Sequence, residues 1–385
     1  MRITFIIIIT GLAFATVSAQ DEEKESPWDI HGYVKQLQTV IKIDGFNTYL
    51  LDNLIHNRIN IRYEPSDHFQ VAVDFRNRIF YGDLVKLNPA FADQIETGNN
   101  AYFDLSAHLI NKEDWLVNST IDRAYMQYTK GNWEARLGRQ RINWGISTTW
   151  NPNDLFNAFS FTDFDYEERP GSDAFRLKYY LGFASSIEIA ASAGRTWDER
   201  VIATMYKWNM KQYDFQILTG FSQNNWVVGG GWAGNLKTAG FKGEWSYFFA
   251  DDAMGKNSFA LTASIDYSFA NSLYISGGYL YNSNGRTSGS LSDLFSFQLS
   301  AKNLYPFKHA IMTSFGYPIT PLINSSLALI YSPVSSHPLF ISPNLTVSVA
   351  QSWDLDLVGQ LVFNKDNNKY SSPVAAGFIR LKFSF

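Results

Sequence analysis

The sequence predicts an all-β protein, a single antiparallel transmembrane β-barrel of about 16 to 18 strands. Three observations lead to this fold class. Apolar and polar residues alternate at period two along most of the chain. Aromatic residues make up 16% of the sequence, yet the mean hydropathy is only −0.17. The chain also ends, at Phe385, on a strand with one apolar face.

The N-terminal segment has the pattern of a secretory signal peptide. Arg2 precedes an apolar stretch over residues 3–15, which is followed by small residues up to Ala19. Small residues before a cut site predict cleavage after Ala19. A membrane anchor is the alternative, but the apolar stretch is shorter than the ~20 residues that a spanning helix needs. We therefore expect a signal peptide over residues 1–19 and one outer-membrane barrel domain over residues 20–385.

Composition argues against several kinds of site and partner. The sequence has no cysteine, so neither a disulfide nor a thiolate metal site can form. Its formal net charge of −4 gives no reason to expect a nucleic-acid partner, which would favour a basic domain. Aromatic side chains without long apolar runs are typical of the girdles that flank the lipid-facing band of a barrel. No cofactor and no metal are expected.

Alternation is clearest in four segments, 69–76, 175–181, 239–247 and 259–269. In the last of these, an apolar residue occupies every odd position. Such a pattern indicates a strand whose two faces meet different surroundings. Further strands are expected at 30–43, 54–63, 120–129, 133–142, 184–194, 201–210, 212–222, 225–234, 272–281, 307–317, 323–332, 340–350 and 354–363, and from 374 onward. Bacterial barrels have even strand numbers, and the status of residues 293–300 decides the count.

Short and long connections alternate between these segments. Short ones at 64–67, 130–132, 182–183, 270–271 and 317–321 suit tight periplasmic turns. Two long loops, 80–118 and 143–173, lack sustained alternation and are expected to face outward or to fold into the lumen. A soluble β-sandwich or propeller would also alternate. It would bury its apolar face, however, and would have no reason to combine an export signal with a terminal Phe strand.

The last strand indicates assembly in the outer membrane of a Gram-negative bacterium. Every second residue from Phe385 back to Gly377 is apolar or Gly, and the other face carries Ser384, Lys382 and Arg380. A terminal Phe on such a strand resembles the signal by which the barrel-assembly machinery recognises outer-membrane proteins. An ordinary amphipathic edge strand would show the same alternation. The expected partners are this machinery, outer-membrane lipid and a small polar solute.

Four short motifs lie close together in the first half of the chain. They are Ile121-Asp122-Arg123-Ala124-Tyr125, Gly138-Arg139-Gln140-Arg141-Ile142-Asn143-Trp144-Gly145, Trp150-Asn151-Pro152-Asn153-Asp154 and Glu168-Arg169-Pro170-Gly171. This stretch resembles the porin-like barrels of Bacteroidota and Proteobacteria that carry a "GRQ…WG…NP.D" signature, a group distantly similar to alginate-export-type barrels. The resemblance implies a single barrel that acts as a passive pore with an undefined solute. It implies no ligand residues.

Basic residues are concentrated on one predicted wall. Ten of the fifteen arginines lie between Arg58 and Arg176. On strands with clear alternation, the basic residues opposite the apolar face are Arg58, Arg62, Arg76, Arg78, Arg136, Arg176 and Lys178. A lipid-facing arginine at the bilayer midplane would cost about 2–4 kcal/mol, so this face is expected to line the lumen. Arg139 and Arg141 share the face of Leu137, and either lie at the membrane interface or are turned inward by a bulge near Gly138.

The second long loop is acidic and aromatic. It carries Asp154, Asp163, Asp165, Glu167 and Glu168. If it folds inward, one hypothesis is a constriction with Arg76, Arg136 and Arg176 facing Asp163 and Asp165, whose transverse field would filter solutes by charge. The alternative is that these charges pair with each other and only hydrate a polar lumen. The loop aromatics Trp144, Trp150, Phe156, Phe159, Phe161 and Phe164 are either a path for sugar rings or packing against the wall.

The function that these observations predict is passive passage of small polar solutes through the outer membrane. The histidines are His31, His56, His68, His108, His309 and His337; none shares a short motif with a serine elbow or carboxylate cluster, so an enzyme is not expected. The first strand begins too early to leave room for the plug of a TonB-type receptor or the hatch of a fatty-acid channel. The remaining alternative is a structural or adhesive barrel whose lumen is closed by loops.

Overall fold

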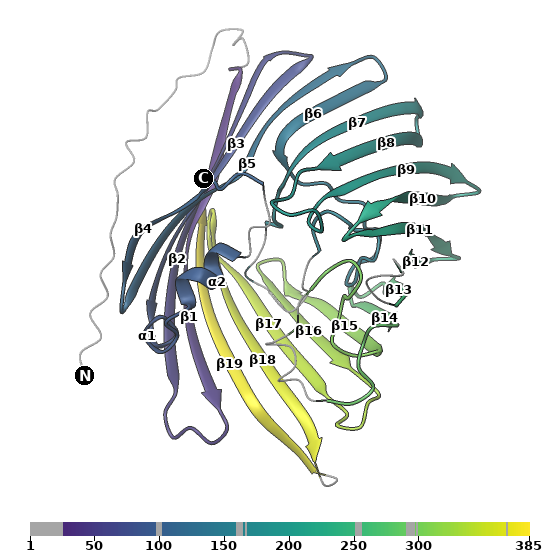
Figure 1. Ribbon diagram of the computed structural model, residues 1–385. Coiled ribbons are helices and arrows are strands. Elements are labelled where there is room, and N and C mark those ends of the chain that lie inside the picture. The colour runs from purple at the N-terminus through teal and green to yellow at the C-terminus, as the bar shows by residue number, and fades with distance from the viewer. Residues whose placement is uncertain are drawn as a thin grey trace.

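The chain forms a closed antiparallel β-barrel (Figure 1). The computed structural model describes residues 26–97, 102–158, 165, 168–250, 256–289, 297, 299–366 and 369–385. Each strand pairs with the next one in the chain, except that β3 pairs with β5 rather than with β4, and β1 also pairs with β19, which closes the ring. The ring has 18 strands, so the predicted fold class and strand number are confirmed.

The strands are long and two short helices occur among the described residues. The strands are β1 (Trp28–Ile43), β2 (Leu50–Ser66), β3 (Phe69–Gly82), β4 (Ser106–Lys112), β5 (Trp115–Lys130), β6 (Trp133–Gln140), β7 (Ser172–Gly182), β8 (Ser185–Ser192), β9 (Val201–Met210), β10 (Tyr213–Ser222), β11 (Asn225–Leu236), β12 (Ala239–Phe248), β13 (Ser258–Ser268), β14 (Tyr274–Asn282), β15 (His309–Thr320), β16 (Ile323–Tyr331), β17 (Leu339–Ala350), β18 (Trp353–Asp366) and β19 (Lys369–Ser384). The helices are α1 (Asp83–Leu87) and α2 (Phe91–Thr97). None of the described helices is long and apolar enough to cross a membrane.

The first long loop differs from its prediction. β3 continues to Gly82 and β5 begins at Trp115, and the residues between them include α1, α2 and β4. β4 pairs with Trp115–Thr120 of β5, while β6 pairs with Ala124–Lys130 of the same strand. Because β3 occupies the other edge of β5, β4 takes the place beyond the end of β6. Local alternation over seven residues was too short to reveal this strand from the sequence.

One further expectation changes in detail. Residues 317–321 were predicted as a turn, but β15 continues through Pro318 to Thr320 with a register shift at that point. A bulge explains this, because proline cannot donate to a regular ladder and is tolerated where the pairing is interrupted. Residues 1–25, and most of 293–300, lie outside the described residues.

The outer face of the wall carries aromatic residues near both ends of the strands. At the end with the short turns, the Trp28 ring packs at a tilt against the Tyr63 ring, with ring centroids 4.4 Å apart. At the end with the long loops, Tyr81 stacks on Trp115 at 4.7 Å. Apolar side chains such as Ile189 lie exposed between such residues. This arrangement of girdles around an apolar band is that of a barrel that crosses a bilayer.

Candidate functional site

The connection between β6 and β7 lies inside the barrel. We call residues 141–171 the lumen loop; the structure describes all of them except 159–164, 166 and 167. At its start, Trp144 donates its indole N–H to Glu188 of β8 at 2.6 Å, and its carbonyl accepts from Gln216 of β10 at 2.6 Å. Further along, Asp165 forms an ion pair with Lys35 of β1 at 2.7 Å. A segment that contacts strands half a ring apart must cross the lumen.

Glu244 of β12 is the deepest anchor of this loop. Its carboxylate accepts the backbone N–H of Ile146 at 2.7 Å, and the backbone of Ser147 and Asn153 also lies within its reach. The Glu244 side chain is fully buried. Asn153 adds a bond from its amide to the carbonyl of Gly230 in β11, at 2.9 Å. Buried loop backbone needs hydrogen-bond partners, and here the wall supplies them.

Asp154 is buried at the centre of the loop. Burial raises the pKa of its carboxyl to about 7, and the charges of Arg169 and Arg141 act in the opposite direction. Arg169 lies 3.4 Å from the Asp154 carboxylate. The predicted acidic residue therefore does not face the open lumen. It belongs to the internal structure of the loop.

The loop aromatics that the structure describes pack rather than line a path. Trp144 and Phe156 form an edge-to-face pair with centroids 5.1 Å apart. Trp150 meets Tyr305 in the same manner at 5.8 Å. Phe159, Phe161 and Phe164 lie outside the described residues. For Trp144 and Trp150, which are almost fully buried, the packing alternative is the one the structure supports.

The basic residues of β2 and β3 lie on the face that contacts the lumen loop, and each has a partner. Arg58, with no exposed surface, binds Asp74 at 2.9 Å and Asp122 at 2.5 Å. Arg62 also pairs with Asp74, and Arg76 binds Asp122 at 2.9 Å. The strip on this wall is therefore a ladder in which carboxylates alternate with guanidinium groups.

Arg78 continues this ladder and donates to the Asn118 side chain at 2.9 Å. On β6 and β7, a basic side chain again pairs with carboxylates. Arg176 pairs with Glu134, and it also lies 3.8 Å from Glu188. Arg136 donates to Gln127, and Lys178 lies over the ring of Tyr180 at 4.6 Å.

The acidic loop residues meet bases other than those predicted. Asp165 pairs with Lys35 and lies 3.4 Å from Arg380, and Glu168 lies 3.7 Å from Arg58. Asp163 and Glu167 lie outside the described residues. Among the described groups, the proposed facing of Asp165 with Arg76, Arg136 and Arg176 is not seen, because wall carboxylates already bind Arg76 and Arg176.

Sequence reasoning missed the residues that neutralise the basic strip. They are Asp74, Asp122, Glu134 and Glu188. It also missed Lys35 and Arg380, which pair with Asp165 of the loop, and Asp356, which pairs with Arg380. The signal was present for Asp74, which shares strand parity with Arg76. It was hidden for Asp122 and Arg123, since β5 has a register shift there that brings consecutive residues to the same face.

Arg139 and Arg141 lie in different environments. Arg139 keeps the outward face and binds Asp173 at 2.9 Å, beneath the backbone of Phe103. No register shift interrupts the pairing around Gly138, although its φ is +119°. Arg141 follows the end of β6 and contributes to the electrostatic environment of Asp154. Of the two alternatives for these arginines, the bulge near Gly138 is not seen in the strand pairing, and burial under a neighbouring segment explains how Arg139 is tolerated on the outer face.

No group of three or more His, Asp or Glu side chains that could hold a metal ion occurs in the described part of the chain. His56 is buried beside Tyr33, with the hydroxyl and imidazole 3.4 Å apart. His309 and His337 contact the hydroxyls of Tyr279 and Tyr331, each at 2.7 Å. These three histidines are therefore hydrogen-bonded to tyrosine hydroxyls of the barrel.

The fold and the lumen define a transmembrane β-barrel that holds one of its own loops across the lumen. No known family and no curated protein matches the sequence. Solved structures do match the fold. OccK9 (OpdG) of Pseudomonas aeruginosa is similar with a TM-score of 0.62 and 8% identity, over 93% of this chain and 98% of that one. OccAB1 of Acinetobacter baumannii is similar with a TM-score of 0.59 and 10% identity, over 95% and 99%. At such identities the likeness shows the shared fold.

Proposed function

We propose that this protein is an outer-membrane channel through which small polar solutes pass passively. The observation that carries the proposal is the lumen itself: a ring of 18 strands whose inner face holds paired charges such as Arg58 with Asp122 and Arg176 with Glu134. Barrels of about 16–18 strands are wide enough for an aqueous channel. Charged side chains on the inner face stabilise water there and offer polar contacts to a passing solute.

The location and the assembly route are part of the same proposal. A signal peptide at residues 1–19 would direct export, and the strand that ends at Phe385 would be read by the barrel-assembly machinery of a Gram-negative outer membrane. The "GRQ…WG…NP.D" stretch supports membership of the porin-like group that it resembles. The protein is proposed to have no catalytic role, and lipid and solute are its proposed partners.

A structural or adhesive barrel with a closed lumen is the second candidate. The observation that favours it is the lumen loop, which reaches from Gln216 on β10 to Arg380 on β19 and fills part of the interior. The two candidates differ in one measurable property, the passage of ions.

The test is conductance of the purified full-length mature barrel in planar lipid bilayers, with insertion verified independently. Discrete open-channel steps are expected, with an ion selectivity that changes when Arg176 is replaced by Gln. The matched control is Lys237→Gln, an exposed residue in the turn between β11 and β12. Absence of steps at any voltage would contradict the channel. If Glu244→Leu then produced steps by releasing the loop, the closed-lumen candidate would replace it.

A further inference from the structure

The outer face of β1, β2, β3 and β5 carries a stripe of uncharged polar side chains. We call Gln36, Gln38, Asn53, Asn57, Asn77 and Ser119 the amide stripe. They lie on the outward face because their neighbours along each strand, such as Lys35, Arg58 and Arg76, are buried on the lumen side. The strand register makes them adjacent: Gln38 pairs with Asn53, Asn57 with Asn77, and Asn77 with Ser119.

The stripe lies within the apolar band of the barrel. On β19, the residues opposite Gln36 and Gln38 are Leu381 and Ile379, which point outward and are exposed. On β3, Phe75 and Ile79 flank Asn77 on the same face. The stacked pair Tyr81 and Trp115 lies beyond them, nearer the rim. The amides therefore lie between apolar side chains that face the hydrocarbon of the bilayer.

Only some of the polar side chains of the amide stripe have hydrogen-bond partners within the chain. Asn77 donates to the Asn57 side chain at 3.2 Å and accepts from Ser119 at 2.7 Å. Gln38 donates to the backbone carbonyl of Asp52 at 3.1 Å. Within the described part of the chain, the side-chain amides of Gln36 and Asn53 have no hydrogen-bond partner. Gln36 is exposed. Hydrocarbon offers no partner to such a group, so an unsatisfied amide there is strongly unfavourable.

Corresponding positions elsewhere on the wall hold side chains suited to lipid. Ile187 and Ile189 occupy the outward face of β8, and Leu355 and Leu357 that of β18. The stripe is therefore a local departure from the pattern of the barrel.

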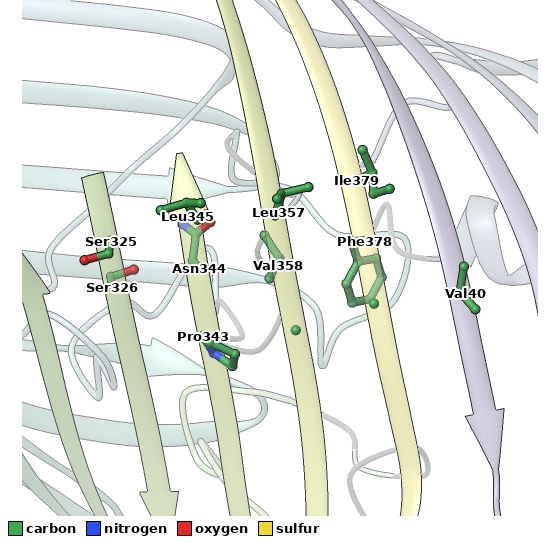
Figure 2. Close-up of a pocket in the computed structure, with 12 residues that line it drawn as sticks. Val40, Ser325, Ser326, Pro343, Asn344, Leu345, Leu357, Val358, Phe378 and Ile379 are labelled. Atoms are coloured by element: carbon green, nitrogen blue, oxygen red, sulfur yellow. The ribbon is translucent and has the colours of Figure 1, made fainter. Parts of the chain in front are cut away.

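A shallow apolar groove lies beside the stripe, on β16 to β19 and β1 (Figure 2). Its volume is about 570 Å³. Gly359 and Gly377 line it: the space over Gly377 is open, and the Pro343 ring lies against Gly359. Leu357, Ile379 and Val40 stand at its sides. Val40 is on the same outward face of β1 as Gln36 and Gln38. Stripe and groove therefore form one continuous surface.

We propose that a second copy of this chain covers this surface in the membrane, with amides of one copy hydrogen-bonded to amides of the other. A primary amide both donates and accepts, so a stripe of amides can satisfy itself when two copies meet. The stripe carries no charge, so it lacks the group that would select an ionic lipid headgroup or a charged partner. The adjoining groove gives apolar side chains of the second copy a place to pack. Burying the amides against each other removes the cost of exposing them to lipid.

Cross-linking in the native membrane tests this proposal before detergent can separate the copies. The sequence has no cysteine, so Gln36→Cys creates a single reactive site on the full-length protein. Ile189→Cys, on the outward face of β8, is the matched control for chance collisions. Treatment with a short bismaleimide is expected to link two chains at least tenfold more efficiently at position 36 than at position 189. Equal yields at both positions would overturn the proposal.

Counting subunits gives a second readout that does not depend on cysteine geometry. Single-molecule photobleaching of the barrel in lipid vesicles is expected to show two or more steps per particle. The variant Gln36→Leu with Asn53→Leu, which should remain folded because it makes the outer face more apolar, is expected to shift particles toward one step. One-step particles in the unmodified protein would overturn the proposal, as would a monomer that retains a bound lipid in native mass spectrometry.

Discussion

Replacing Asp154 with Asn tests whether the lumen loop titrates near neutral pH. Burial raises the pKa of the Asp154 carboxyl to about 7, from 3.8 for a free side chain. The folded loop therefore binds more protons than the unfolded loop between these values. The contribution of Asp154 to the stability of the loop should fall as pH rises from about 4 to about 7 and stay constant above that. Three pKa units at 1.36 kcal/mol each correspond to about 4 kcal/mol.

Asparagine has the shape of the protonated acid and does not titrate, so Asp154→Asn removes the free-energy cost of ionising a buried carboxyl. Hydrogen exchange of loop peptides in the reconstituted barrel, corrected for the intrinsic rate at each pH, measures the opening free energy. In the variant we expect a smaller loss of protection with rising pH, since Glu244 remains as a second buried carboxyl that holds the loop, and at pH 8 about a thousandfold more protection than in the unmodified chain. Asp67→Asn, in the exposed turn after β2, is the control. Weaker protection in Asp154→Asn at pH 8 would refute the reasoning, because it would show that the ionised carboxylate stabilises the loop through Arg169.

Three further predictions concern the wall. Reversing charge with Arg76→Glu and Arg176→Glu should shift the reversal potential in a salt gradient toward cation selectivity; unchanged potentials would show that these groups lie away from the narrowest point. Arg58→Met should destabilise the refolded barrel in urea titrations by about 3–5 kcal/mol, because it leaves Asp122 buried without its closest cation, and a loss below 1 kcal/mol would contradict this. Gly138→Ala should reduce the folded fraction on heat-shift gels, because φ is +119° there and an added Cβ would meet the backbone oxygen of residue 124; normal yields would mean that β6 can shift.

The sequence was sufficient for the ring because strand alternation is a local property. Each predicted strand overlaps an observed one, since the two faces of a barrel strand meet lipid and water and must differ residue by residue. Strand ends were less predictable. β2 extends to Leu50 and Ser66, beyond the expected 54–63, because pairing with β1 and β3 continues past the alternating core.

The site was only partly predictable because its contacts are distant in sequence. Parity placed Arg58 and Arg76 on one face, but nothing local indicated that Asp122, on another strand, binds both. The anchor Glu244 lies 98 residues from Ile146 in the sequence, and its carboxylate accepts the backbone N–H of Ile146. Such a pairing exists only after the barrel has closed. A search for acids on the same face as the arginines would have found Asp74 and would have corrected the emphasis on an uncompensated basic strip.

The anchors of the lumen loop determine what kind of constriction it can form. Its early part is bound to β8, β10 and β12 through Trp144 and Ile146, and its later part to β1 and β19 through Asp165. A loop held on opposite walls cannot swing open about one hinge, because release of either side leaves the other bound. In the proposed channel, a solute must therefore pass beside the anchored loop rather than through an opening made by its movement. This geometry favours a fixed filter whose selectivity depends on single charges, rather than a gate that opens as a unit.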